Sequence, residues 1–214
     1  MGTHIAKHIK VVLFDHDDTL VGTKDTKWAQ HKFTAKKYYG KELTDEEIKL
    51  HWGKPLEELI CILYSTTDAD QAMMHLKRHH LEFPKDLFAE TIPTLTQLKA
   101  KGFLTGVITA SNRYSFEHDL NLHHIASMLL DYTQTSDDTK FHKPDSRVFE
   151  PVIAWLTKQH IHPSEVIYVG DGLHDMKAAL GAGFQFIGVQ TGLVTAKEFQ
   201  QNGAKSVVNI AHLL

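Results

Sequence analysis

Short runs of consecutive apolar residues recur along the chain and predict buried strands. The first run covers Ile9 to Phe14, where apolar and β-branched residues follow one another without a helical period. Later runs read FLTGVIT, MLLD, VIYVG, FQFIGV and SVVNI. Continuous apolar runs of this length are typical of strands that are covered on both faces of a sheet. MLLD, at residues 128–131, is the shortest strand predicted in this way.

Between the first and second of these runs the pattern changes to amphipathic helices. Gly40 ends the first predicted helix, and Thr44 with Glu47 forms a capping box at the start of the second. Pro55 suits the first turn of a third helix, whose apolar residues recur at helical spacing. A fourth helix follows around residues 73–80. The stretch contains no run typical of a strand.

After Pro84, helical patterns alternate with the apolar runs. Helices are predicted around residues 93–102, 115–122, 149–156, 176–182 and 196–201. Such alternation favours right-handed crossovers and a parallel sheet. We therefore expect an α/β fold: a three-layer Rossmann-like parallel sheet core, formed by residues 1–21 and 86–214, with an inserted all-helical cap domain at residues 22–85.

Composition narrows the class of protein. The 214 residues are 42% hydrophobic and 23% charged, which is ordinary for a globular protein, and the net charge of −3 favours neither nucleic acid nor an anionic membrane as partner. No apolar run reaches the length of a membrane span. Cys61 is the single cysteine and excludes an internal disulfide framework. We expect a soluble cytoplasmic protein.

Polar residues follow several of the predicted strands, and in open α/β sheets ligands bind beyond the carboxyl ends of the strands. We expect the following side chains to meet there: Asp15, Asp17, Thr109, Ser111, Lys143, Asp171 and Asp175. Several carboxylates in one place require a cation, and hard oxygen ligands suit Mg²⁺ better than zinc. A hydroxyl, backbone amides and a lysine around that ion suit a phosphoryl group.

The order of these motifs resembles a known family. DHDDT, ITAS, HKP and GDGLHD are similar to the four motifs of the haloacid dehalogenase-like (HAD) hydrolase superfamily, and TGLVTAKEFQQNGA extends the likeness toward the C-terminus. The resemblance is greatest to the phosphoglycolate phosphatase and β-phosphoglucomutase branch. In that branch the helical insertion corresponds to a small C1-type cap domain.

The resemblance implies a role for each motif residue. Asp15 is expected to be the nucleophile and Asp17 the general acid/base. Phosphoryl oxygens are expected to bind Thr109 and the backbone amides near Ala110 and Ser111, while Lys143 neutralises charge. The expected Mg²⁺ ligands are Asp15, the carbonyl of Asp17, Asp171 and Asp175.

Four further residues are candidates for substrate contacts. His16 lies between the two expected catalytic acids and is predicted to point toward the cap. Arg113 either assists phosphate binding or caps a helix. Trp52 and Lys54, in the turn HWGKPLEE between two cap helices, either face the active site or are exposed to solvent.

The function predicted from these residues is Mg²⁺-dependent hydrolysis of a small phosphorylated metabolite through an aspartyl-phosphate, by a monomer or weak homodimer whose cap closes over the substrate. A phosphomutase and a phosphonate hydrolase are alternatives on the same core, and a dehalogenase would need neither Asp17 nor Mg²⁺. A phospho-accepting signalling module is the alternative from another class. In such modules the acidic pair precedes the acceptor aspartate, whereas here the metal-site acids come last. A binding protein without catalysis is disfavoured because every catalytic position is filled.

Overall fold

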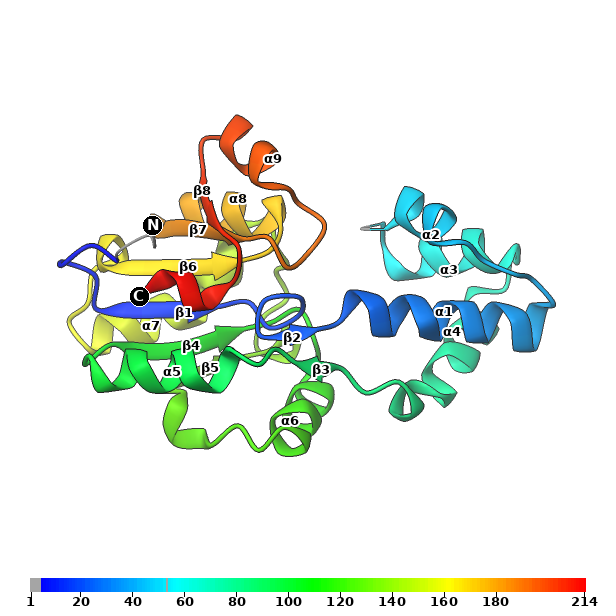
Figure 1. Cartoon of the computed structure of the whole chain (residues 1–214), viewed down its shortest axis with the longest axis horizontal. Coiled ribbons are helices and arrows are strands. Elements are labelled where there is room, and N and C mark those ends of the chain that lie inside the picture. Colours follow the sequence, from blue (N-terminus) through cyan, green and yellow to red (C-terminus); the bar gives the residue numbers. More distant parts are fainter. Residues whose placement is uncertain (1–4, 53) are drawn as a thin grey trace. The chain divides into compact units, whose positions relative to one another are not determined.

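The computed structural model of the chain describes residues 5–52 and 54–214. The chain divides into two compact units. The core unit contains the residues up to Gly22 and those from Leu87 onward, and the helical unit contains Thr23–Asp86. Figure 1 shows the elements of each unit along the chain.

The centre of the core unit is a sheet of six parallel strands in the order β5-β4-β1-β6-β7-β8. The strands are β1 (Val11–Phe14), β4 (Leu104–Ile108), β5 (Tyr132–Gln134), β6 (Val166–Gly170), β7 (Gln185–Val189) and β8 (Lys205–Val207). The strands β2 (Val21–Gly22) and β3 (Asp86–Leu87) pair in a separate two-stranded sheet. The central position of β1 places the residues that follow it between the ends of β4 and β6.

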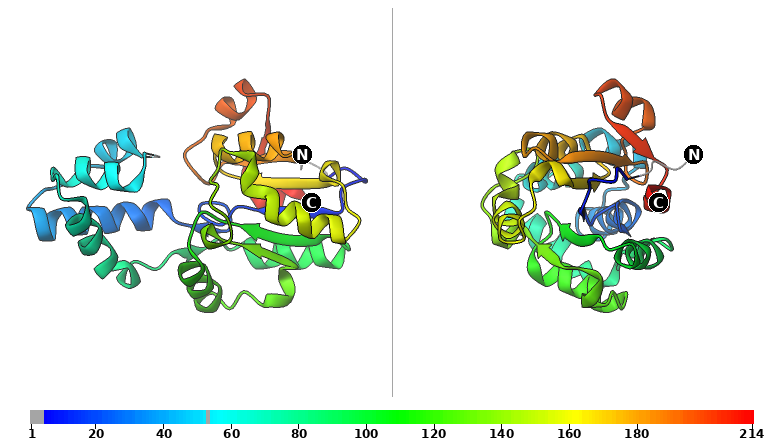
Figure 2. Two further views of the ribbon diagram at one scale, coloured as in Figure 1. Left: turned by 180° about the vertical axis from the view of Figure 1, so that it is seen from behind. Right: turned by 90° about the vertical axis from the view of Figure 1, so that its left-hand side faces the viewer.

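Helices cover both faces of the six-stranded sheet (Figure 2). On one face lie α5 (Thr91–Ala100), α6 (Arg113–Leu122), and the 3₁₀ helices η2 (Ser127–Leu129) and η6 (Ile210–Leu213). The other face is covered by η4 (Ser146–Phe149), α7 (Glu150–Lys158), α8 (Leu173–Gly181) and α9 (Ala196–Gln201). Two short 3₁₀ helices, η3 (Ser136–Asp138) and η5 (Pro163–Glu165), lie in connections. The predicted three-layer α/β class is confirmed. Among the described residues, no helix is both long and apolar enough to pass through a membrane.

Side-chain alternation along β1 divides the apolar core into two clusters. Val11 and Leu13 pack with side chains of η4, α7, α8 and α9, whereas Val12 and Phe14 pack with side chains of α5, α6 and η6. All four side chains are fully buried. Because successive strand residues point to opposite faces, a strand covered on both sides must be apolar throughout. This accounts for the uninterrupted apolar run in the sequence.

The helical unit consists of α1 (Lys24–Tyr39), α2 (Asp45–His51), α3 (Leu56–Tyr64), α4 (Ala69–Arg78) and η1 (His80–Glu82). Gly40 ends α1 in the left-handed conformation, with φ of 63°. The Thr44 hydroxyl accepts from the Glu47 N–H at 3.2 Å, and the Glu47 carboxylate accepts from the Thr44 N–H at 2.8 Å. The predicted capping box and helix end are therefore present.

The strand predicted at MLLD is wrong. Residues 127–129 form η2 instead, and the edge strand β5 begins at Tyr132. Leu129 and Leu130 pack against the apolar cluster on the α5 face, so their burial comes from a turn and not from a strand. In the strand β5 the buried Gln134 side chain is satisfied by a hydrogen bond that its amide donates to the Val148 carbonyl at 2.6 Å.

Gly106 in β4 lies where the backbone of β5 approaches closely. A Cβ atom at this position would be 2.8 Å from the Tyr132 carbonyl oxygen and 2.9 Å from Leu13 Cδ2. We expect Gly106→Ala to lower the free energy of unfolding by about 1–3 kcal/mol, because the strands must move apart. Denaturant unfolding would measure the loss. Lys205→Ala on the exposed edge strand is the control and should change stability by less than about 0.5 kcal/mol. Equal stability of the two variants would contradict the close approach.

Candidate active site

The ends of three neighbouring strands bring the candidate residues together. Phe14 of β1 is level with Val107 of β4 and Val169 of β6, so these strands end side by side. Asp15 follows β1 directly, and Thr109 follows β4. Asp171 follows β6, and Asp175 lies in the first turn of α8. The juxtaposition predicted from the sequence is thus present in the core unit.

Strand alternation separates Asp15 from its neighbour His16. Asp15 continues the face of Leu13 and meets Lys143, whereas His16 continues the opposite face. The His16 ring is fully buried, with Nε2 3.0 Å from Asp119 Oδ2 and an edge-to-face contact with Phe116. Its side chain therefore points into the core against α6. The prediction that His16 points toward the cap and contacts substrate is wrong.

A tight turn places Asp17 after these residues. Asp18 adopts the left-handed conformation with φ of 55°, which Asp tolerates better than most residues, and its N–H donates to the Val21 carbonyl at 2.7 Å. The Asp17 carboxylate accepts from the Ser111 hydroxyl at 2.9 Å and from the Thr109 hydroxyl at 3.4 Å. Asp17 thus faces the end of β4, while Asp15 faces Lys143.

Lys143 is the buried cation of the site. Its Nζ lies 2.7 Å from Asp15 Oδ1 and 2.7 Å from Asp175 Oδ1, and its side chain is only 4% exposed. Burial acts to lower the pKa of Lys143, but Asp15 and Asp175 outweigh it and hold that pKa well above its usual value. The ammonium therefore persists at every physiological pH.

Tyr168 is a member of the site that the motifs did not reveal. Its hydroxyl accepts from Lys143 Nζ at 2.9 Å and donates to the Ile108 carbonyl at 2.9 Å. Burial raises the pKa of the Tyr168 phenol well above its usual value, so the hydroxyl keeps its proton. The one available signal was a phenol within the apolar run VIYVG, two residues before Gly170.

Three carboxylates form what we call the acidic cluster: Asp15, Asp171 and Asp175. Each has an oxygen within 4.8 Å of an oxygen of the other two. Burial raises the pKa of Asp15 to about 6. Burial together with Asp15 and Asp175 raises the pKa of Asp171 well above its usual value. One ammonium cannot balance three carboxylates, so the donor set fits an additional cation with a preference for oxygen ligands.

Gly192 is a second residue that the motifs did not reveal. A Cβ atom there would lie 1.9 Å from Asp171 Oδ2, so any other residue would displace that carboxylate. Gly192 belongs to the segment TGLVTAKEFQQNGA. This close approach gives that segment a physical connection to the acidic cluster.

The expected phosphate-binding loop lies beside Asp17. The Ser111 N–H donates to the Thr109 hydroxyl oxygen at 3.0 Å, and Ala110 between them is exposed. The predicted role of the Ser111 amide in holding phosphoryl oxygens would require this internal hydrogen bond to open. Thr109 itself is buried and remains next to Asp17.

Arg113 is the first residue of α6, and its backbone N–H and its guanidinium both pair with acidic residues of η3. Its N–H donates to Asp137 Oδ2 at 2.9 Å, and its guanidinium pairs with the Asp138 carboxylate. The N-cap of α6 is Asn112, whose side chain accepts from the Ser115 N–H at 2.8 Å, so the alternative that Arg113 caps a helix is wrong for α6. A role in phosphate binding would require the ion pair with Asp138 to break.

The two cap candidates make contacts inside the helical unit. The Trp52 ring packs edge-on against Trp28 and His31, with centroids 5.9 and 6.0 Å apart. Lys54 forms an ion pair with Glu58 one helical turn later, and Gly53 between the candidates lies outside the described residues. Substrate contacts by Trp52 and Lys54 stay a prediction.

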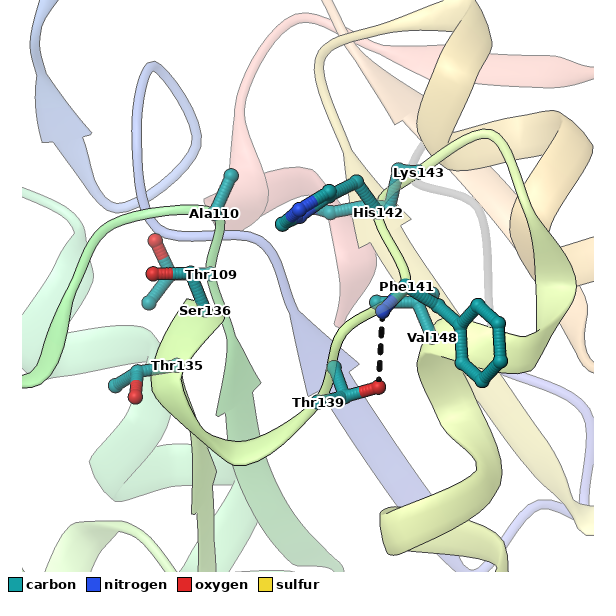
Figure 3. Close-up of a pocket in the computed structure, with 9 residues that line it drawn as sticks. All are labelled: Thr109, Ala110, Thr135, Ser136, Thr139, Phe141, His142, Lys143 and Val148. Atoms are coloured by element: carbon teal, nitrogen blue, oxygen red, sulfur yellow. Dashed lines mark hydrogen bonds between the residues drawn. The ribbon is translucent and has the colours of Figure 1, made fainter.

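A small cavity lies between the loop after β4 and the segment that carries Lys143. Figure 3 shows its lining side chains, which include Thr109, Ala110, His142 and Lys143. The cavity has a volume of about 10 Å³. That is room for about one water molecule, so a phosphate ester does not fit there.

Comparison with known proteins agrees with this fold. The family model described as haloacid dehalogenase-like hydrolase matches residues 12–189, most of the chain. This chain belongs to the haloacid dehalogenase-like hydrolase family. The resemblance predicted from the four motifs is thereby confirmed.

Relatives and solved structures support the assignment. The chain is 33% identical over 185 residues to the putative pyrophosphatase PpaX of Clostridium perfringens, covering 85% of this chain and 84% of the relative. It is 31% identical over 186 residues to the pyrophosphatase PpaX of Bacillus velezensis, covering 86% and 84%. A putative haloacid dehalogenase-like hydrolase from Bacteroides fragilis shares its structure with a TM-score of 0.74 and 31% identity, covering 92% and 95%. A putative β-phosphoglucomutase from Thermotoga maritima has a TM-score of 0.80 at 20% identity, covering 94% and 95%, and shows the same fold.

The crowding of carboxylates makes stability depend on pH. The pKa of Asp15 is raised from 3.8 to about 6 in the folded protein. Protonated Asp15 therefore contributes to the free energy of unfolding in full below pH 3.8, and this contribution is lost as the pH rises through 6. Asp171 acts in the same direction. In chelator we therefore expect Asp171→Asn to raise the melting temperature, and more so at alkaline than at acidic pH, because the carboxylate that it removes repels its neighbours only when ionised.

Thermal unfolding with chelator and with excess Mg²⁺ would measure both effects. Added Mg²⁺ should stabilise the wild-type protein and should stabilise Asp171→Asn much less. Asp70→Asn, at an exposed position of the helical unit, is the control and should behave like the wild type. A lower melting temperature of Asp171→Asn in chelator would contradict the repulsion inferred for the acidic cluster.

Proposed function

We propose that the chain is a Mg²⁺-dependent phosphatase that acts on a small phosphorylated compound through an aspartyl-phosphate. The observation that carries the proposal is the pairing of buried Lys143 with Asp15 and Asp175, 2.7 Å from each, beside Asp171. A carboxylate next to a fixed ammonium and a cation site can attack phosphorus, since phosphoryl transfer depends on positioning and charge neutralisation. Membership in the hydrolase family supports the same reaction class.

Mg²⁺ fits the donors of the acidic cluster. Asp15, Asp171 and Asp175 offer oxygen ligands, and the cluster contains none of the sulfur or nitrogen donors that favour zinc. We propose that these three residues and the Asp17 carbonyl hold the ion. When bound, it supplies positive charge that offsets the carboxylates and the phosphoryl oxygens.

The first step uses both acids of the loop after β1. An Asp15 oxygen attacks phosphorus, and the bond between phosphorus and the leaving oxygen breaks. Protonated Asp17 gives its proton to that leaving oxygen. Lys143, 2.7 Å from Asp15, balances negative charge where the phosphoryl group is transferred.

The second step restores the enzyme. Water attacks the phosphorus of the aspartyl-phosphate, Asp17 takes up the water proton, and the bond between phosphorus and the Asp15 oxygen breaks to release phosphate. The hydroxyls of Ser111 and Thr109, 2.9 and 3.4 Å from Asp17 Oδ2, orient the carboxyl group that carries the proton in both steps.

The names of the relatives suggest the first substrates to test. Both relatives described above are named pyrophosphatases, so inorganic pyrophosphate joins the small phosphate monoesters as a candidate. In either case the leaving group is an oxygen that Asp17 can protonate. A phosphomutase on this core would transfer the phosphoryl group to a second hydroxyl instead of water.

Phosphate release from a panel of compounds tests the proposed function. We expect turnover of an aryl phosphate and of at least one among pyrophosphate and small sugar phosphates, with Mg²⁺ present. Chelator should abolish turnover, and excess Mg²⁺ should restore it, because the acidic cluster needs a cation to accept an anionic substrate. Full activity in chelator would contradict the cation site. A protein that releases phosphate from no compound would contradict the phosphatase assignment.

Substitutions of the loop after β1 separate the proposed roles of its acids. Asp15→Asn should show neither turnover nor phospho-enzyme, because its nucleophilic carboxylate is gone. Asp17→Asn should lose about 10²–10⁴ in kcat on an alkyl phosphate and less on an aryl phosphate, whose leaving oxygen needs little protonation. Steady-state kinetics and intact-mass measurement would record both.

Asp18→Asn is the matched control for these substitutions. Asn also tolerates the left-handed conformation found at Asp18, so the turn and most of the activity should be retained. Phosphate found on Asp17 or on a histidine would show that the roles are assigned wrongly.

A further inference from the structure

Tyr168 carries a polar group in a place that otherwise calls for an apolar one. It lies in the middle of β6, level with Leu13 of the central strand, and its side chain is fully buried in the cluster on the α8 face. A phenylalanine would fill nearly the same volume without a hydroxyl to desolvate. Burying a hydroxyl costs free energy unless it is hydrogen-bonded. The hydrogen-bond partners of the Tyr168 hydroxyl therefore indicate its role.

The partners of that hydroxyl are Lys143 and the strand that ends in the phosphate-binding loop. It accepts from Lys143 Nζ at 2.9 Å and donates to the Ile108 carbonyl at 2.9 Å. Ile108 directly precedes Thr109. The side chain of Tyr168 therefore reaches from β6 past the central strand β1 to β4. Both hydrogen-bonding functions of the phenol are used.

Tyr168 also completes the partners of the ammonium. An ammonium has three protons, and Lys143 Nζ has three near partners: Asp15 at 2.7 Å, Asp175 at 2.7 Å and Tyr168 at 2.9 Å. The Ile108 carbonyl, at 3.4 Å, is distinctly farther away. Lysine has a long flexible stem, and these three partners, from three separate segments of the chain, restrict its charge to one place.

We infer that Tyr168 is a positioning residue for Lys143, which keeps the ammonium directed at Asp15 and Asp175 while Asp15 changes its chemical state. This inference rests on the proposed function, in which Asp15 alternates between a free carboxylate and an aspartyl-phosphate. Tyr168 is the one neutral partner of Lys143 among the three, and it takes no part in bond making or breaking. The competing explanation is a purely structural tyrosine that satisfies the Ile108 carbonyl.

Tyr168→Phe is the direct test, because it removes one oxygen atom and retains the ring. We expect kcat on an aryl phosphate to fall on the order of tenfold to a hundredfold, the range typical when a supporting partner of an active-site group is removed. The KM should change by less than about twofold, because Tyr168 does not touch the substrate. A wild-type kcat for this variant would overturn the inference.

Tyr132→Phe is the matched control. Tyr132 is a half-buried phenol on β5, next to the same apolar cluster, and its hydroxyl donates to Gln134 Oε1 at 3.2 Å. Its loss should leave kcat and KM near their wild-type values. Equal losses of kcat in the two variants would favour the structural explanation and overturn the inference.

A double-mutant cycle with Lys143→Met shows whether Tyr168 acts through Lys143. In the Lys143→Met background, Tyr168→Phe should reduce kcat no further, because the group that it positions is absent. A further tenfold loss would mean that Tyr168 acts independently of Lys143. If Lys143→Met fails to fold, the comparison of Tyr168→Phe with Tyr132→Phe still decides the question.

Unfolding measurements separate failure of this inference from failure of the proposed function. If the wild-type protein hydrolyses no phosphate ester, the proposed function fails, and the same cycle is then read from unfolding free energies. If Tyr168→Phe lowers the free energy of unfolding more in the wild-type background than in the Lys143→Met background, the contact between Tyr168 and Lys143 is supported. Equal losses in both backgrounds overturn it.

Discussion

A buried ammonium between two buried carboxylates is the interaction on which the core unit and its site both depend. Lys143 comes from the segment before η4, Asp15 from the end of β1, and Asp175 from the first turn of α8. None of these charges could remain in the interior by itself, because breaking a buried ion pair leaves an uncompensated charge. The pairing therefore ties three segments of distant sequence together at one edge of the sheet. It also sets the place where a phosphoryl group could be transferred.

The same edge of the sheet carries more negative charge than Lys143 can balance. Asp171 joins the two paired acids, and burial raises the pKa of Asp15 to about 6. Such repulsion is unfavourable for the folded chain in the absence of a cation. A cation held by the three carboxylates would remove this repulsion, so the acidic cluster is arranged to favour cation binding. Local instability of this kind is common where a site is preorganised for a charged ligand.

The two-residue period of β1 gives neighbouring polar residues separate surroundings. Asp15 faces Lys143, which also pairs with Asp175 of α8, whereas His16 turns to Asp119 on α6. The turn at Asp18 then directs Asp17 toward the hydroxyls of Thr109 and Ser111. One short loop thus presents a candidate nucleophile and a candidate proton carrier to different partners, while the histidine between them anchors the loop to a helix.

The sequence by itself determined the features that depend on local pattern. The apolar runs predicted the strands β1, β4 and β6, Gly40 and Thr44 marked helix ends, and the strand-end motifs predicted that Asp15, Lys143 and Asp171 come together. Only the tertiary structure decided which way each polar side chain points and what it meets. His16 was misplaced because its partner Asp119 is 103 residues away, and Tyr168 was missed because its hydroxyl meets a lysine from another segment. The strand predicted at MLLD was wrong because a short apolar run is found both in turns that pack on the core and in edge strands of a sheet. Contacts between distant segments are set by packing, and no local pattern records them.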